Sequence, residues 1–215
     1  MTTLAIDCAT PACSVALFEG ERCLANAHEI LGRGHAERLV PLIAALPGRG
    51  RANRILVSLG PGSFTGVRIG LATARALGLA WGAEVLGYPT LALVATMARE
   101  EHPGESVTVC MAGGHGEWFV QDFDEYGLPE QPVASRTPKA AASHTGYRLL
   151  AGSRAVELAE LTGQAHEVHD ILPDARKALL VPSELLTREL TPIYGRGPDA
   201  RLPGVKAGAQ TETAP

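Results

Sequence analysis

The group of residues best suited to chemistry is a glycine-rich turn at residues 60–66, with the sequence Gly-Pro-Gly-Ser-Phe-Thr-Gly. It follows a short apolar run and opens a long helical pattern, and a helix N-terminus of this kind suits an anion. The common phosphate loops do not match, however. A Walker loop ends in Gly-Lys-Ser/Thr, whereas Val67 and Arg68 follow Gly66 here. The dinucleotide fingerprint needs glycine where Thr65 stands, so nucleotide binding at this turn is the weaker interpretation.

A second candidate is Asp7, which ends the first apolar strand shortly before Thr10. Both side chains could contact phosphate, but an Asp at a strand end more often caps a tight turn through the local backbone. Metal-assisted phosphoryl transfer needs carboxylates to hold magnesium and order the nucleophile. The predicted elements repeat in the second half of the chain, as described below. The loop there that corresponds to the one after Asp7, residues 112–114, is Ala-Gly-Gly. If the two halves face each other across a cleft, only one side supplies an acid, which is too few carboxylates for this chemistry.

Other reactive residues form no recognisable catalytic or metal-binding motif. Ser63 has no adjacent histidine, and its surroundings lack the G-x-S-x-G elbow of a serine hydrolase. Cys8 and Cys13 could face each other across a turn, but we expect reduced thiols rather than a disulfide. His166 and His169 could meet on a helix, yet no third ligand is near in sequence. We therefore predict no catalytic residue and no metal site.

The elements that must position these residues follow an α/β pattern in the first half of the chain. Residues 4–7, 13–18 and 23–28 predict an antiparallel meander of three strands. The elements predicted next are a helix over 35–46, a strand over 55–59, a helix from the glycine-rich turn to about Trp81, a short strand at 85–86 and a helix over 91–99 capped by Thr90.

The same pattern restarts near residue 103. Its predicted strands cover residues 107–111, 117–123, the region of Val133 and 147–151, and its predicted helices cover 138–142, 155–162, 175–180 and 183–190. We expect a domain at 1–102, a smaller domain at 103–194 and a disordered tail at 195–215. Two halves that each open with a meander predict two ribonuclease-H-like subdomains, the architecture of actin, sugar kinases and heat-shock ATPases, with mixed sheets flanked by helices.

The helix after the glycine-rich turn carries Gly66, Gly70, Ala74, Gly78 and Gly82 at every fourth position. At about 3.6 residues per turn, this row stays near one face of the helix. Interior glycine costs ~1 kcal/mol relative to alanine, so we expect the face to gain stability from close packing. The packing partner is either another element of the same domain or a helix of another subunit, and the residues alone leave both open.

Composition limits the possible partners of the 215-residue chain. Its formal net charge of -4 argues against an independent grip on nucleic acid, and the basic residues at 136, 139 and 148 have no interleaved aromatic platform. No apolar run approaches the ~18 residues that span a bilayer. The first residues lack the pattern of a signal peptide, so we expect a cytoplasmic protein.

Several longer motifs carry a family resemblance, which is strong over residues 1 to about 100 and looser beyond. They are the opening Leu-Ala-Ile-Asp-x-Ala-Thr at 4–10 with Cys-Ser-Val-Ala-Leu at 13–17, His35-x-x-x-Leu39-x-Pro41, the run Gly-Pro-Gly-Ser-Phe-Thr-Gly-Val-Arg-Ile-Gly at 60–70, Gly116-Glu117, and Pro192-x-Tyr194-x-Arg196. With these motifs the chain resembles the TsaB family, also called YeaZ, of bacterial tRNA threonylcarbamoyladenosine biosynthesis.

The resemblance implies a non-catalytic paralogue of TsaD, the subunit that transfers a threonylcarbamoyl group to the adenosine 3′ of the tRNA anticodon. It implies a heterodimer with TsaD, a ternary complex with the ATPase TsaE, and a supply of threonylcarbamoyl-adenylate from TsaC or Sua5. The partners would hold ATP and metal, tRNA would be reached only through the complex, and the isolated chain would form a homodimer. The implied interface consists of His35, Leu39, Gly66, Val67, Ile69, Gly70, Thr73, Ala74, Leu77 and Gly78; His35 could instead cap its own helix.

The metal-binding His-x-x-x-His pair of the paralogue corresponds to Thr90 and Val94, so the resemblance implies that this chain lacks that site. Ala-Gly-Gly at residues 112–114 replaces an Asp-Ala-Arg run of many family members, which argues against a vestigial nucleotide site at Asp7 and Thr10. Two other classes of function stay open. One is an enzyme, either an ATP-dependent phosphotransferase or the peptidase suggested by the family's old glycoprotease label. The other is a direct tRNA-binding module.

Overall fold

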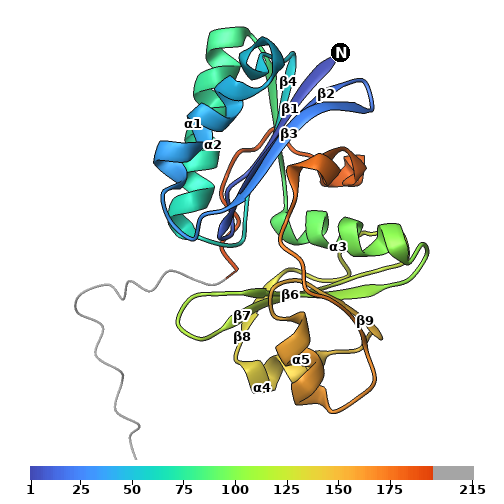
Figure 1. Cartoon of the computed structure of the whole chain (residues 1–215). Helices are drawn as coiled ribbons and strands as arrows, with labels where there is room; N and C mark the ends of the chain where they lie inside the picture. The colour runs from blue at the N-terminus through green and yellow to red at the C-terminus, as the bar shows by residue number, and fades with distance from the viewer. Residues whose placement is uncertain (196–215) are drawn as a thin grey trace, which may run out of the picture.

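The computed structural model describes residues 1–195 (Figure 1), and its first sheet is organised around a strand that is buried on both faces. A strand covered on both sides takes a central place in its sheet. The strand order is β3-β2-β1-β4-β5, with β1, β2 and β3 antiparallel and β4 and β5 parallel to β1. The strands are β1 (Thr2–Asp7), β2 (Ala12–Glu19), β3 (Arg22–Ile30), β4 (Arg54–Ser58) and β5 (Glu84–Tyr88).

The second sheet repeats this arrangement with β6 in the place of β1. Its order is β10-β9-β6-β7-β8, with β7 and β8 antiparallel and β9 and β10 parallel. The strands are β6 (Val107–Ala112), β7 (Trp118–Phe123), β8 (Ala134–Arg136), β9 (Leu149–Ala151) and β10 (Glu167–His169). The predicted repetition of the two halves is confirmed, although β10 was not predicted.

Helices lie in three layers around the two sheets (Figure 1). On the outer face of the first sheet lie α1 (His35–Ala45) and α2 (Phe64–Trp81), and on the outer face of the second lie α4 (Pro138–His144) and α5 (Ala155–Thr162). Between the sheets lies α3 (Thr90–Glu101), together with the 3-10 helix η2 (Ala175–Leu180). Two further 3-10 turns are η1 (Pro47–Gly50) and η3 (Ser183–Leu185).

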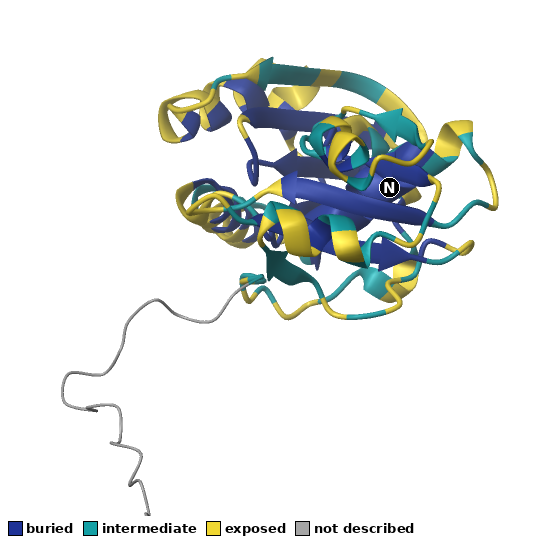
Figure 2. Ribbon diagram, turned by 90° about the horizontal axis from the view of Figure 1, so that it is seen from below, coloured by how far each residue is buried: buried dark blue, intermediate teal, exposed yellow. Residues whose placement is uncertain are grey.

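Alternation along the strands divides the apolar side chains among these layers. In β1, Leu4 and Ile6 pack toward α1 and α2, whereas Ala5 packs toward α3. The helix α3 is apolar on nearly all sides, with Leu91 to Ala95 fully buried, because it touches both sheets. Figure 2 shows this distribution, with buried strands inside and exposed residues on the outer sides of the helices.

The end of the described chain returns to the first half. Thr187 and Gly87 exchange backbone hydrogen bonds, and the Ile193 amide donates to the Leu59 carbonyl oxygen at 2.8 Å. Residues 187–193 therefore lie against the first sheet although they follow the second in sequence. The domain division at residue 102 stays a prediction. Of the tail expected to be disordered, 195–215, the structure describes Gly195, which accepts a hydrogen bond from the Ser135 amide at 3.0 Å, and residues 196–215 lie outside the described part of the chain.

Most predicted elements are present, but three local predictions are wrong. Thr90 does not cap α3; Pro89 holds that position, and the Thr90 hydroxyl lies 3.1 Å from the Ser58 hydroxyl. The helix predicted over 183–190 is only the turn η3, because Thr187 is extended and forms a bridge with Gly87. Residues 166 and 169 do not share a helix, since His169 ends strand β10.

Cys8 and Cys13 face each other across the turn between β1 and β2, as the sequence suggests. Both thiols are buried, with 3.7 Å between the Sγ atoms, and neither forms a disulfide. The hydrogen bond to Cys13 and burial raise the pKa of the Cys8 thiol. Among the described residues, no helix combines the length and the hydropathy needed to cross a bilayer.

Candidate functional site

The glycine-rich turn brings the start of α2 into direct contact with the loop after β1. The Ser63 amide donates to the Ala9 carbonyl oxygen at 2.7 Å, and Ser63 Oγ caps the helix by accepting from the Gly66 amide at 3.2 Å. A Cβ atom at Gly62 would lie 2.0 Å from the Ala9 oxygen, and one at Gly66 would lie 2.0 Å from the Cys8 oxygen. Only glycine fits at these two positions, so backbone packing accounts for the turn without a bound anion.

The small-residue row of α2 faces the first sheet of the same chain. Ala74 is fully buried, and a Cβ at Gly70 would lie 3.7 Å from side chains of Cys8 and Val57. A Cβ at Gly78 would lie 2.4 Å from the side chain of Val85. Of the two interpretations of this row, packing within the domain is therefore the correct one.

This packing corrects the interface implied for the helix. Gly66, Gly70, Ala74 and Gly78 are covered by their own sheet, so they are not available to a partner. Val67 is 5% exposed, which removes it from the interface for the same reason.

His35 and Leu39 of α1 are also turned inward. Leu39 is fully buried, and His35 Nε2 lies 2.9 Å from the Thr10 carbonyl oxygen and 3.3 Å from that of Ala12. The imidazole donates a hydrogen bond to the loop between β1 and β2, so it neither caps its own helix nor points outward. Both residues are corrected from interface to structural positions.

The opposite side of α2 forms a continuous surface without charge that is exposed or partly exposed along its length. We call it the outer α2 face, and it consists of Thr65, Ile69, Ala72, Thr73, Ala76, Leu79 and Ala80. Leu79 is 89% exposed, and the spacing of three or four residues aligns the members along the helix. Two residues of the implied interface, Ile69 and Thr73, belong to this face; a third, Leu77, is half-buried at its edge.

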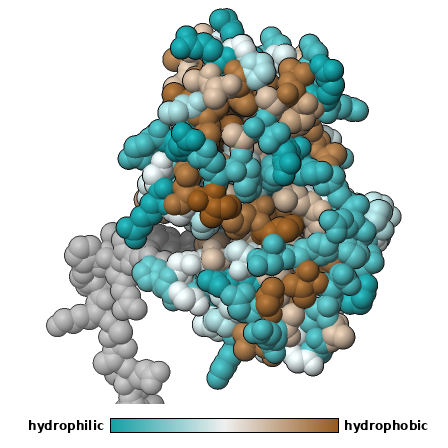
Figure 3. Space-filling model, viewed as in Figure 1, coloured by the Kyte–Doolittle hydropathy of each residue, from teal (hydrophilic) through white to brown (hydrophobic). Residues whose placement is uncertain are grey.

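The two arginines beside the outer α2 face are engaged with the returning chain. Arg68 donates to the Tyr194 hydroxyl at 2.5 Å, and Arg75 donates to the Leu190 carbonyl oxygen at 2.8 Å. Neighbouring α1 adds another exposed apolar side chain, Val40. Figure 3 shows hydrophobic surface over the upper part of the molecule, where these helices lie, and along the junction of the two halves.

A cavity of about 840 Å³ opens between the two halves. Thr10 and Phe64 line it from the first half, and Met111, Gly113 and Phe119 line it from the second. None of the described residues that line it is acidic, and Asp7 is not among them. The described wall therefore offers hydroxyls, apolar groups, the Arg68 guanidinium and the His115 imidazole, but no carboxylate to hold a metal ion.

Asp7 is sealed beneath this cavity. Its carboxylate accepts hydrogen bonds from the Ala9 amide at 2.9 Å and from the Tyr88 hydroxyl at 3.2 Å. Burial raises the pKa of Asp7 to about 6, although these two hydrogen bonds oppose the rise. Thr10, the other residue expected to contact a cofactor, accepts from the Ala12 amide at 3.2 Å. The geometry agrees with the turn-capping interpretation of both residues.

Two tyrosines with defined roles were not identified from the sequence as site residues. Tyr88 donates a hydrogen bond to the Asp7 carboxylate, and the position of Tyr88 in the sequence gives no indication of this role. Tyr194 stacks near Phe64, with ring centroids 6.1 Å apart, while the Arg68 guanidinium lies over the Phe64 ring. In the sequence, Tyr194 was noted only as part of the family motif Pro192-x-Tyr194-x-Arg196.

Strand order and the paired sheets place the molecule in one class of protein: a duplicated ribonuclease-H-like fold of the actin and sugar-kinase type. The family model of TsaD, tRNA N6-adenosine threonylcarbamoyltransferase, matches residues 28–169. The structure of YeaZ from Pseudomonas aeruginosa is similar, with a TM-score of 0.76 and 27% identity, over 90% of this chain and 99% of that one.

Sequence comparison identifies the family within this class. The tRNA threonylcarbamoyladenosine biosynthesis protein TsaB of Escherichia coli is 36% identical over 162 residues, which is 71% of this chain and 68% of the relative. The protein of the same name from Haemophilus influenzae is 38% identical over 143 residues, or 59% of each chain. The chain belongs to the TsaB/YeaZ family.

The contacts of α2 predict opposite effects of alanine at two glycines. Gly66→Ala should lower the free energy of unfolding by about 3 kcal/mol or more, because its methyl group meets a backbone oxygen that cannot rotate away. Gly70→Ala meets only ordinary contacts and should raise it by up to ~1 kcal/mol through helix propensity. Urea unfolding measures both, and equal effects would contradict this packing.

The buried Asp7 predicts a pH-dependent loss of stability. Between its ordinary pKa of 3.8 and the folded value of about 6, the folded carboxyl is protonated while the unfolded one is ionised. The native state then binds more protons, so the free energy of unfolding falls as pH rises through this window. Relative to that of the native chain, the free energy of unfolding of Asp7→Asn should increase by about 2 kcal/mol between pH 4 and pH 7.

Asp174 supplies a control of opposite sign. Burial alone would raise its pKa, but hydrogen bonds from the side chain and backbone of Arg176 outweigh burial and lower it. Asp174→Asn should therefore lose stability, relative to the native chain, as pH rises from the acid range. Parallel pH profiles for the native chain and Asp7→Asn would refute the assignment.

Proposed function

We propose that this chain is a non-catalytic subunit of tRNA threonylcarbamoyladenosine biosynthesis that pairs with TsaD. The names of its relatives supply the pathway, and the match to the TsaD family model supports descent from a common fold. The chain acts in the cytoplasm, reaches tRNA only through the complex, and works with TsaE and with TsaC or Sua5.

The observation that carries the proposal is the outer α2 face. Seven uncharged residues lie side by side on one helix and are exposed or partly exposed in the single chain. Such a face gains free energy when another apolar surface covers it, at about 25 cal/mol per Å² of apolar area buried. Its small alanines let a partner helix approach closely, while Ile69 and Leu79 supply apolar area. A second copy of the chain meets the same requirement, so we expect the isolated protein to form a homodimer.

The cleft supports a partner rather than an enzyme. Its described lining has no carboxylate. Two acids lie behind that lining: Asp7 accepts hydrogen bonds from Ala9 and Tyr88, and Glu117 accepts one from Ser135. Thr90 and Val94, at the positions of the paralogue's metal-binding pair, are fully buried and have no metal-binding side chains. In this account ATP and the metal ion belong to the partner subunits.

A charge on the outer α2 face tests the proposal. Ala76→Glu should keep the fold, since Ala76 is exposed, but should weaken the complex with TsaD by about 30-fold or more. That factor corresponds to about 2 kcal/mol for an unpaired charge buried at an interface. Size exclusion with light scattering, on the chain alone and mixed with TsaD of the same organism, measures the change.

Ala140→Glu is the matched control, because Ala140 is an exposed alanine on α4 in the other half of the molecule. It should leave the complex intact. Equal binding by Ala76→Glu and the native chain would show that the partner uses another surface. Robust ATP hydrolysis by the chain alone, lost in Asp7→Ala, would favour the phosphotransferase function instead.

A further inference from the structure

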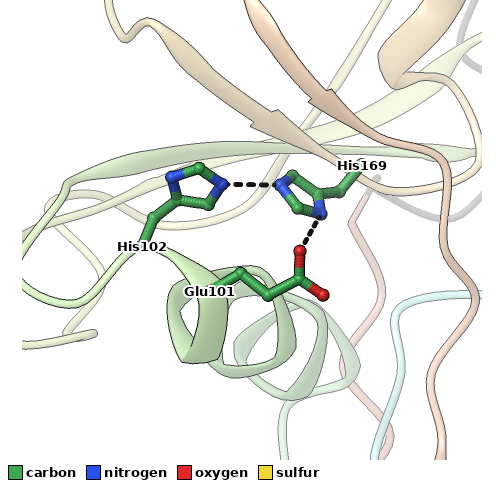
Figure 4. Close-up of side chains that lie close together, drawn as sticks. All are labelled: Glu101, His102 and His169. Atoms are coloured by element: carbon green, nitrogen blue, oxygen red, sulfur yellow. Dashed lines mark hydrogen bonds and ion pairs between the residues drawn. The ribbon is translucent and has the colours of Figure 1, made fainter.

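Two histidines from distant parts of the chain meet on the side of the central helix layer. His102 directly follows α3, and His169 ends strand β10. Their Nε2 atoms are 3.0 Å apart, and the rings are nearly perpendicular, at 80° (Figure 4). Both side chains are mostly buried, at 19% and 15% exposure, so the rings are held in this arrangement by their surroundings.

Each imidazole also has a carboxylate near its other nitrogen. His102 Nδ1 lies 3.7 Å from Glu105 Oε1, and His169 Nδ1 lies 3.9 Å from Glu101 Oε2. Figure 4 shows Glu101 on the last turn of α3, directed at the far side of the His169 ring. The order in space is therefore carboxylate, imidazole, imidazole, carboxylate.

This order matches the ligand arrangement of a transition-metal site. A histidine that binds a metal ion through one ring nitrogen usually donates its other N–H to a carboxylate, which fixes the tautomer and the ring orientation. Here both Nδ1 atoms have a carboxylate at ion-pair distance, and the two Nε2 atoms face each other. Two nitrogens that each lie about 2.1 Å from one tetrahedral zinc ion are about 3.4 Å apart. The observed separation of 3.0 Å is therefore about 0.4 Å short of that distance, and a small movement of the two rings would admit the ion.

We propose that His102 and His169 bind one divalent transition-metal ion, of which Zn²⁺ is the representative case, through their Nε2 atoms. Glu101 and Glu105 hold the two rings through Nδ1 and add negative charge beside the ion. One ligand atom each from Glu101, His102 and His169 lie within 4.8 Å of one another. Water completes the coordination. Without metal, one Nε2–H donates to the other nitrogen, so the ion replaces a shared proton.

The ion would join the end of α3 to β10, the edge strand of the second sheet. The site shares no residue with the outer α2 face or with the cleft. A test of metal binding is therefore independent of a test of the proposed function.

Calorimetric titration of the full-length, tag-free chain with ZnCl₂ tests the site, and Co²⁺ absorption reports tetrahedral nitrogen ligation. His102→Gln and His169→Gln retain side-chain size and hydrogen bonding, and each should weaken Zn²⁺ binding at least 10-fold. Glu105→Gln should weaken it by about 10–100-fold. Circular dichroism checks that each variant remains folded.

His166→Ala is the control, because His166 lies three residues before His169 but contacts Thr162 and the Arg148 carbonyl oxygen instead. It should bind Zn²⁺ as the native chain does. If the native chain binds Zn²⁺ no more tightly than the folded His102→Gln and His169→Gln variants, the pair is a simple hydrogen bond and the proposal fails.

Discussion

The structure depends on the close approach of α2 to the loop after β1. The carbonyl oxygens of Cys8 and Ala9 occupy the space that side chains at positions 66 and 62 would need. This contact brings the helix so close to the first sheet that the small residues from Gly66 to Gly78 are buried against it. The remaining surface of the helix, the outer α2 face, is left exposed, and its lack of charge suits it to a partner.

The same contact also buries the acid at the end of β1. The loop that packs under α2 is the one that follows Asp7, and it closes over that carboxylate, which Tyr88 holds from the other side. In the second half, the loop after β6 contributes Ala112, Gly113 and Gly114 to the cavity. Both halves thus keep the strand order of the fold, while the described wall of the cleft presents no acid.

Sequence periodicity was sufficient for most of the fold, because strand alternation and helix spacing are local properties. The row of small residues also predicted close packing correctly. It could not show which surface was the partner, because the same spacing serves a sheet within the domain or a helix of another subunit. The family resemblance favoured a helix of another subunit, whereas the burial of Gly70 and Ala74 shows packing against the sheet of the same domain. His102 and His169 are 67 residues apart, so no local pattern could reveal their contact.

The central claim is that the outer α2 face is the surface that a partner covers. Hydroxyl-radical footprinting tests it directly, because the oxidation rate of a side chain follows its exposure to solvent. In the single chain, Leu79 on α2 and Leu161 on α5 are 89% and 49% exposed. On addition of TsaD, the account predicts strong protection of Leu79 and Ile69 with no change at Leu161. Unchanged oxidation of Leu79 in a saturated complex would contradict it.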